Sequence, residues 1–290
     1  MTDMRKVLIT GSNGFIGKHL IQALEKKGIE IVKFDKNSGK DIVSNKDFAD
    51  LAKTDTVFHL AAVSGYKDSK ESAFLAYKVN IMGTINVLEY CRKVGAKIVF
   101  PSTYVYAEPY EKIKKETDAV KPTTNYSYTK YLGEQCCQFY SRIYGVDSLI
   151  LRTSNVYGAG QEGKYIVPII ADHILNNKEL TLTKENVERS FIYIDDLIEI
   201  YIKLAEVKTK PGEIYNVGPN KSTTLKELVE LISKLAGKQA KVKYSGVSRP
   251  DEVDINRIDS SKTKNKIDWQ PTISLKEGLK RYLISKSKRT

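Results

Sequence analysis

Cysteine, histidine and tryptophan are scarce in this chain of 290 residues, which contains three, three and one of them. The cysteines stand at positions 91, 136 and 137, with neither a CxxC spacing nor an even count. This pattern predicts neither a zinc site nor a framework of disulfides. We therefore expect reduced thiols and no bound metal.

Long apolar runs are also missing. No uninterrupted stretch approaches the roughly 18 apolar residues that a membrane helix needs. The N-terminus lacks the apolar segment and small-residue cleavage site of a secretory signal. We expect a cytoplasmic protein without a membrane partner.

The formal net charge is +12, but the basic residues are scattered along the chain and often stand beside acids. A nucleic-acid-binding protein would gather them in one patch or stripe, so we expect no nucleic-acid partner. A positive field instead attracts a small anionic substrate or the phosphate of a cofactor.

The first half alternates β-branched runs with helical apolar spacing, which is typical of βαβ units and a parallel sheet. Strands are predicted at residues 6–10, 30–35, 56–60, 97–102 and 148–153. Helices are predicted at residues 16–27, 47–53, 73–94 and 126–144. We therefore predict an α/β fold with a doubly wound parallel sheet of the Rossmann type.

The pattern changes after residue 158. A glycine-rich loop, a helix near 167–176 and short strands at 180–183, up to 194 and at 212–217 are predicted, followed by a helix at 225–237. We expect residues 1–160 with about 187–217 to form the sheet domain. Residues from about 161 to 186 and from 218 to 290 would then form a smaller, mixed C-terminal lobe.

Three glycines follow the first predicted strand and open the first predicted helix. In this context Gly11 permits a tight turn, Gly14 lets the backbone approach a pyrophosphate, and Gly17 lets the helix pack closely against the strand. The helix dipole favours the phosphate charge. The strand, loop and helix together predict a dinucleotide-binding site, although the spacing is GxxGxxG rather than GxGxxG.

Asp35 ends the second predicted strand, near the distance at which a carboxylate reaches the adenosine ribose. A carboxylate at this place repels a 2′-phosphate, so the sequence favours NAD over NADP. Lys36 argues the other way, because a cation beside the ribose tolerates that phosphate.

Tyr126 and Lys130 lie one turn apart on one face of a predicted helix. A lysine ammonium lowers the pKa of a neighbouring phenol, so that the phenolate can take a proton from a substrate hydroxyl while hydride leaves for a nicotinamide. The Tyr-x-x-x-Lys pattern occurs four times in the chain, with the other tyrosines at positions 66, 110 and 282. Only Tyr126 both follows a sheet strand and opens a long amphipathic helix, and Ser102 and Thr103 end that strand.

With these residues in place, the chain resembles the extended short-chain dehydrogenase/reductase family, in its nucleotide-sugar epimerase/dehydratase branch. The motifs that carry the resemblance are residues 10–17, 40–42, 59–62, 100–106 with Tyr126 and Lys130, 151–158, 189–196 and 249–251. The resemblance implies NAD as cofactor. The residues expected to bind it are Gly11, Asn13, Gly14, Phe15, Ile16, Gly17, Asp35, Asp41, Ile42, Leu60, Ala61, Ala62, Asn80, Tyr126 and Lys130.

The resemblance also implies a catalytic set and a substrate site. Ser102, four residues before Tyr106, takes the position of the catalytic hydroxyl beside Tyr126 and Lys130. The residues expected to bind a nucleotide-diphosphate sugar are Ser102, Thr103, Tyr126, Asn155, Arg189 and Arg249. Two arginines suit a diphosphate, because each offers a planar fork of donors. Asn256 falls near the position that gates the 2-substituent of the sugar.

Relatives of this kind pair through two helices, which predicts a homodimer.

Dehydratases of this family are expected to carry Asp-Glu directly after the catalytic hydroxyl, since removing water needs a further acid and base. Thr103 and Tyr104 stand there in this chain. We therefore predict an NAD-dependent nucleotide-sugar 4-epimerase of the UDP-sugar type. A 4-keto-sugar reductase that uses NAD(P)H stays open as the alternative, and a non-catalytic NAD-sensing protein is a third possibility.

Overall fold

The computed structural model describes residues 4–64, 66–107, 112–247 and 253–288. Six parallel strands form the central sheet in the order β10-β5-β4-β3-β1-β2. Their bounds are β1 Lys6–Thr10, β2 Glu30–Phe34, β3 Thr56–His59, β4 Lys97–Thr103, β5 Ser148–Thr153 and β10 Glu213–Val217. Most of their residues are buried, as expected for a parallel sheet that is covered on both faces. The predicted doubly wound α/β fold is confirmed.

The strand order reverses between β1 and β3, because the chain runs outward to β2 from one and to β4 from the other. In open α/β sheets, ligands bind outside the carboxyl ends of the strands at such a point. The glycine loop after β1 and the ends of β3 and β4 therefore lie at the place where the fold provides a crevice.

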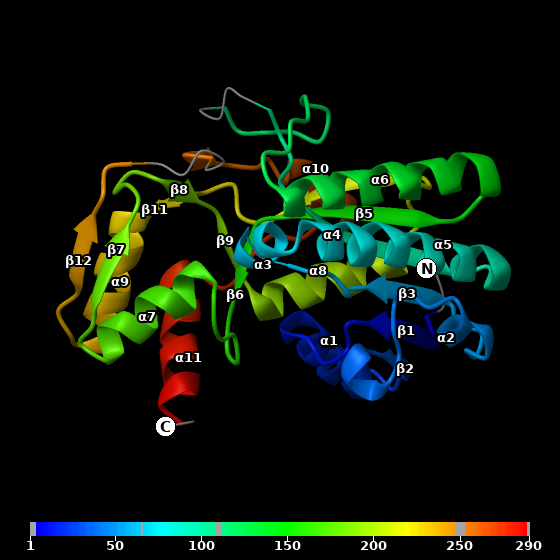
Figure 1. Cartoon of the computed structure of the whole chain (residues 1–290), viewed down its shortest axis with the longest axis horizontal. Helices are drawn as coiled ribbons and strands as arrows, with labels where there is room; N and C mark the ends of the chain where they lie inside the picture. Colours follow the sequence, from blue (N-terminus) through cyan, green and yellow to red (C-terminus); the bar gives the residue numbers. More distant parts are fainter. Residues whose placement is uncertain (1–3, 65, 108–111, 248–252, 289–290) are drawn as a thin grey trace.

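Helices cover both faces of the sheet (Figure 1). On one face α5 (Gly83–Val94) and α6 (Asn125–Tyr144) pack against β3, β4 and β5. On the other, α1 (Phe15–Lys26) packs beside α8 (Ile194–Glu206), which contacts β4. Each face has its own cluster of buried apolar side chains, so the sheet separates two hydrophobic layers.

A second group of elements lies beyond the sheet, at the left of Figure 1. It contains the helices α7 (Ile166–Leu175), α9 (Leu225–Ala236) and α11 (Leu275–Ser287), and the paired strands β7 (Glu179–Leu182) and β12 (Lys241–Tyr244). Two short sheets join it to the rest of the chain. They comprise β6 (Asn155–Tyr157) with β9 (Phe191–Tyr193), and β8 (Glu188–Arg189) with β11 (Thr223–Thr224) and β13 (Ile255–Asn256).

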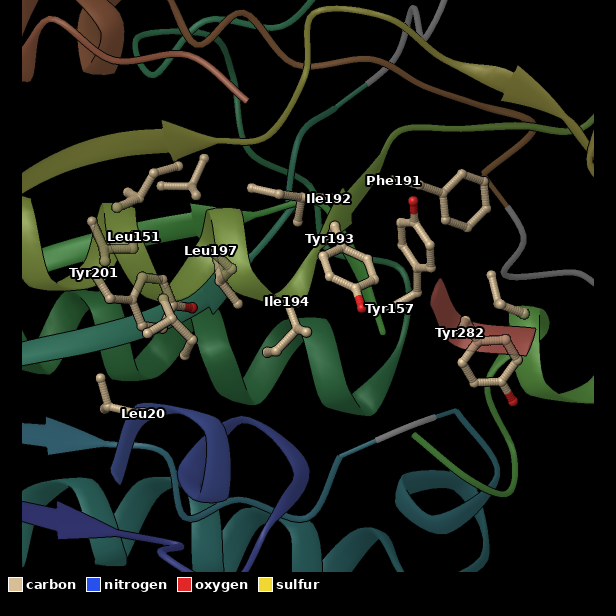
Figure 2. Packing of buried hydrophobic residues seen from close by; sticks show 14 of the residues in the cluster. Leu20, Leu151, Tyr157, Phe191, Ile192, Tyr193, Ile194, Leu197, Tyr201 and Tyr282 are labelled. Carbon is tan, nitrogen blue, oxygen red and sulfur yellow. The ribbon is translucent and has the colours of Figure 1, made fainter. Parts of the chain in front are cut away.

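The hydrophobic core continues from the sheet into this second group (Figure 2). Leu151 of β5 and Tyr201 of α8 belong to the same buried cluster as Tyr157 of β6 and Tyr282 of α11. The Tyr157 ring meets the Tyr193 ring edge-on, with 5.5 Å between the ring centroids. The lobe beyond the sheet is therefore packed directly onto the sheet rather than tethered by a free linker.

Several elements differ from the sequence predictions. The single helix predicted at 73–94 is α4 (Ala73–Tyr77), a π-helical turn η2 (Lys78–Met82) and α5. The helix predicted at 47–53 is shorter, α2 (Lys46–Ala49), and α3 (Tyr66–Glu71), η1 (Lys36–Ser38) and α10 (Ser261–Ile267) were not predicted. No helix within the described residues has the length and apolarity to cross a membrane.

Candidate active site

A cleft of about 940 Å³ opens at the carboxyl edge of the sheet. One half is lined by the glycine loop after β1 and by the loops that follow β2 and β3. The end of β4, the start of α6 and the strands β6, β8 and β13 line the other half. The cleft therefore runs from the nucleotide-binding edge of the sheet to the second lobe.

The glycine loop leaves no room for side chains. Gly11 has φ +69°, and a Cβ atom there would lie 2.7 Å from the Ala61 backbone nitrogen. A Cβ on Gly17 would lie 2.4 Å from the Gly11 carbonyl oxygen. Glycine is required at Gly11 by its left-handed conformation and at Gly17 by the close approach of helix and turn. Helix α1 starts from this turn with Gly14 as its N-cap, so its first amide groups face the cleft as an anion site does.

Asp35 stands at the end of β2 and lines the same half of the cleft. Its carboxylate accepts hydrogen bonds from the backbone amides of Asn13 and Asn37, each at 3.0 Å. These bonds fix the carboxylate against the glycine loop and leave lone pairs for the hydroxyl groups of a ribose. Lys36 and Lys40 also line the cleft, so both signs of charge are present near this position.

Tyr126 and Lys130 lie in the first two turns of α6, at the middle of the cleft. The helix begins with a capping box between Thr124 and Ser127, which fixes the turn that carries Tyr126. Lys130 is 4% exposed, and its ammonium lies 4.0 Å from the centroid of the Phe100 ring. Burial lowers the pKa of Lys130 to about 8.

The phenol of Tyr126 does not titrate in the direction that the sequence predicts. Burial, followed by three neighbouring tyrosines, raises its pKa above the ordinary value. Lys130 is not among the causes. The expectation that the Lys130 ammonium lowers the phenol pKa is therefore not met in this structure, because burial of the phenol raises that pKa.

Ser102 is buried and hydrogen-bonded away from the middle of the cleft. Its Oγ donates to Oε1 of Glu134 at 2.5 Å. Glu134 is fully buried and forms a two-pronged ion pair with Arg152, with distances of 2.7 Å from Nη2 and 3.0 Å from Nε. Thr103, the next residue, is half-buried and lines the cleft. Its hydroxyl has no hydrogen-bond partner among the residues that the structure describes.

Asn80 and His59 are buried residues whose side chains join neighbouring segments of the site by hydrogen bonds. Asn80 lies in the π-helical turn, accepts from the Val63 backbone amide at 2.8 Å and donates to Thr129 Oγ1 at 2.9 Å. It therefore ties the loop after β3 to α6, next to Lys130. The His59 ring bonds Thr10 and Thr84, and burial, with Lys130 as the second cause, lowers its pKa to about 3.

The second half of the cleft contains the substrate residues implied by the family resemblance. Asn155 and Arg189 both line it. Nη1 of Arg189 donates to the Val253 carbonyl at 2.6 Å and to the Glu188 carbonyl at 2.8 Å. Asn256 is buried, and its Nδ2 has no hydrogen-bond partner. Arg249 lies outside the described residues.

Most predicted site residues come together in the cleft. Those that line it are Gly11, Gly14, Phe15, Ile16, Gly17, Asp35, Asp41, Ile42, Leu60, Ala61, Ala62, Ser102, Thr103, Tyr126, Lys130, Asn155 and Arg189. Asn13 and Asn80 do not line it; the amide of Asn13 holds Asp35, and Asn80 is buried behind the site.

Sequence reasoning missed four residues of this region. Glu134 and Arg152 were not predicted, although Glu134 follows Lys130 by one helical turn. Lys114 and Arg257 line the cleft from segments that the sequence does not mark as functional. No signal in the sequence distinguishes these two cations from the many lysines and arginines at the surface.

The residues present fit a dinucleotide. The glycine turn is closed to any Cβ, the amide groups of α1 start at it, and the Asp35 carboxylate is fixed beside it. Within the described residues, no group of three or more His, Cys, Asp or Glu side chains could hold a metal ion. The cleft therefore offers hydrogen-bonding and ionic groups rather than metal ligands.

The fold and the cleft define an α/β protein with a dinucleotide site and a tyrosine and lysine pair beside it. The model of the NAD dependent epimerase/dehydratase family matches residues 7–218. The chain belongs to this family, and the predicted cofactor, NAD, is confirmed.

Relatives match along nearly the whole chain. A putative UDP-glucose 4-epimerase of Methanocaldococcus jannaschii is 32% identical over 305 residues, covering 96% of this chain and 97% of the relative. UDP-glucuronic acid decarboxylase 1 of Arabidopsis thaliana is 29% identical over 302 residues, covering 96% of this chain and 69% of the relative. The solved UDP-glucuronic acid 4-epimerase of Bacillus cereus, in complex with UDP-glucuronic acid and NAD, is 29% identical. It has a TM-score of 0.89 and covers 98% of this chain and 100% of its own.

Proposed function

We propose that this chain is an NAD-dependent nucleotide-sugar 4-epimerase that acts on a UDP-hexose. The observation that carries the proposal is the placement of Tyr126 and Lys130 at the middle of one cleft. The glycine loop and Asp35 lie on one side of this pair, and Asn155 and Arg189 on the other. A proton-transferring pair between a dinucleotide site and a second anion site suits a reaction on the sugar of a nucleotide sugar.

The cofactor and the protein supply different parts of the proposed reaction. Bound NAD would supply the hydride acceptor for C4. Tyr126 takes the proton from the C4 hydroxyl during oxidation and returns it after the ketone has presented its other face. Lys130 supplies a buried cation one helical turn from Tyr126. Arg189 and Asn155 hold the diphosphate, so that the sugar turns while the nucleotide stays bound.

The third catalytic group is a hydroxyl that orients the C4 oxygen. The spacing to Tyr106 predicts Ser102 for this role. Its proton, however, is donated to Glu134, which is itself held by Arg152. Thr103 lines the cleft as Ser102 does, but its hydroxyl has no partner among the described residues. We therefore propose Thr103 as the hydroxyl that binds the substrate, with Ser102 as a positioning residue.

The alternative enzyme activities can be distinguished by what each consumes and releases. A 4-keto-sugar reductase would consume NAD(P)H, and the relatives reported above are named as epimerases and a decarboxylase rather than as reductases. A decarboxylase would release CO₂ from UDP-glucuronate. A dehydratase is disfavoured because Thr103 and Tyr104 replace the expected acid pair.

The activity is tested on purified protein without added cofactor. UDP-glucose, UDP-galactose, their N-acetyl forms and UDP-glucuronate are incubated separately, and the products are read by proton NMR. We expect at least one of them to form its C4 epimer with no net change in NADH absorbance. Tyr126→Phe should abolish conversion, whereas Tyr128→Phe, an exposed tyrosine of the same helix, should not. If no substrate is converted, or if CO₂ is released, the proposal fails.

We propose that residues 1–160 with about 187–217 bind NAD, and that residues from about 161 to 186 with 218–290 bind the nucleotide sugar. We also propose a cytoplasmic homodimer. The three thiols are unpaired, as in proteins of reducing compartments. Exposed apolar side chains on α4, η2 and α6 support pairing of two chains.

A further inference from the structure

Lys114 is a buried cation of the cleft that the proposed reaction does not use. The residue is 8% exposed and lines the cleft. Its ammonium makes no hydrogen bond and no ion pair with any residue that the structure describes. Lys114 therefore lies at the wall of the cleft without an anionic partner among the described residues, where a ligand could supply one.

Three hydrogen bonds fix the backbone of Lys114. Its amide donates to the Arg257 carbonyl at 3.0 Å, and its carbonyl accepts from the Asp259 amide at 2.8 Å and from Asn216 Nδ2 at 2.9 Å. These bonds hold the loop after β4 beside the chain that leaves β13, next to α10 (Figure 1). The lysine is therefore presented on a rigid segment, as a preorganised binding residue is.

The surroundings of Lys114 in the cleft lack negative charge. Among the described residues that line it, none from residue 101 onward is a carboxylate. The guanidinium of Arg257 is already paired with Glu188, with 2.6 Å between Nη2 and Oε2. Asn256 of β13 adds a buried amide nitrogen without a partner. Within the described residues, this half of the cleft thus contains a buried amide nitrogen at Asn256 and an ammonium at Lys114 that no group of the protein pairs.

We propose that Lys114 binds an anionic group of the nucleotide sugar, as a specificity residue of the site. The inference rests on the proposed function. Two parts of such a substrate have the required chemistry, namely the diphosphate and the carboxylate of a hexuronic acid. Either one forms a charge-assisted hydrogen bond with the ammonium, and in a desolvated site this bond is stronger than a neutral one.

Calorimetric titration of the NAD-loaded protein with UDP, UDP-glucose and UDP-glucuronate tests this proposal. The variant Lys114→Met removes the charge, and Lys114→Arg retains it. Lys115→Met is the matched control, because Lys115 is exposed and lies outside the cleft. We expect Lys114→Met to raise Kd about tenfold for at least one ligand, and Lys114→Arg to recover most of the affinity.

The pattern of losses identifies the anion. A loss for all three ligands places Lys114 at the diphosphate, and a loss for UDP-glucuronate alone places it at the sugar carboxylate. The melting temperature of the ligand-free Lys114→Met protein should stay close to that of the wild type, since the ammonium makes no hydrogen bond or ion pair with the described residues. Equal Kd values for Lys114→Met, Lys115→Met and wild type with every ligand overturn the role of Lys114 and leave the epimerase proposal intact. A wild type that binds none of the three overturns both.

Discussion

Two neighbouring hydroxyl groups at the end of β4 lie in different surroundings. Ser102 is 4% exposed and donates to the buried Glu134, whereas Thr103 faces the cleft. The buried ion pair of Glu134 and Arg152 needs every bond it makes, because an unsatisfied buried carboxylate is costly. We therefore expect the two residues to differ in role, with Ser102 acting in stability and Thr103 in substrate binding.

Substitutions at these two positions should separate those roles. Thr103→Val keeps the shape but removes the hydroxyl, and we expect it to lower kcat about 10²-fold without changing the melting temperature. Thr103→Ser should restore most of the activity. Ser102→Ala should lower the free energy of unfolding by about 1–3 kcal/mol, with kcat changed only a few-fold. The opposite result, with kcat lost in Ser102→Ala and kept in Thr103→Val, would return the catalytic role to Ser102.

Lys130, which we propose as a catalytic residue, is a buried cation whose pKa is lowered by its burial. Burial lowers its pKa from 10.5 to about 8 in the folded protein. The unfolded chain then binds more protons between pH 8 and 10.5, so the free energy of unfolding rises with pH across this window. Below pH 8, the buried ammonium destabilises the fold by about 3 kcal/mol at 1.36 kcal/mol for each pKa unit.

Urea unfolding of the wild type and Lys130→Met at pH 7 and pH 10 measures this effect. From pH 7 to pH 10, the free energy of unfolding of the wild type should rise by about 2 kcal/mol more than that of Lys130→Met. Lys130→Met should also lose about 10²-fold or more of the epimerase activity. A stability difference that is the same at both pH values would show that Lys130 titrates normally.

Local patterns predicted the elements around the cofactor well. The strand, glycine turn and helix at residues 6–26 follow from β-branched and helical periodicity joined by glycines, and these are short-range signals. The helix predicted at 126–144 is α6, which begins one residue earlier, at Asn125. Here the sequence specifies the backbone within a few residues.

The helix predicted at 73–94 shows where such patterns fail. Its apolar spacing is continuous, but the structure inserts the π-helical turn η2 between α4 and α5. Asn80 in this turn makes three hydrogen bonds, to Val63 and Thr129. The turn is stabilised by partners 17 and 49 residues away in the chain, which periodicity within the helix does not report. π-Helical turns often occur at functional sites.

The molecule presents an apolar face on the helices that cover one side of its sheet. Phe74 of α4 is 81% exposed, Met82 of η2 is 50% exposed and Ile143 of α6 is 53% exposed. The helices α5 and α6 pack side by side here, and a groove between them is lined by Ile85, Leu132 and Phe139 among others. Exposed apolar patches of this kind mark association sites, and a two-fold pairing of the helices would bury the patch in both chains.

Light scattering after size-exclusion chromatography tests the dimer. We expect the wild type to elute at about twice the chain mass of 32.7 kDa. Ile143→Glu should give a monomer, because a charge would be buried in the interface. Val247→Glu, at an exposed apolar residue away from this face, should stay dimeric. A wild type that elutes as a monomer contradicts the proposal.

The sequence by itself determined the βαβ order, the glycine turn, Asp35 at the end of β2 and the Tyr126 and Lys130 pair. These features depend on contacts within one strand, turn or helix. Only the tertiary structure decided that Ser102 faces Glu134, that burial sets the pKa of Tyr126, and that Lys114 lies unpaired in the cleft. Each of these depends on side chains that are distant in the chain, since burial and charge pairing are properties of the packed molecule.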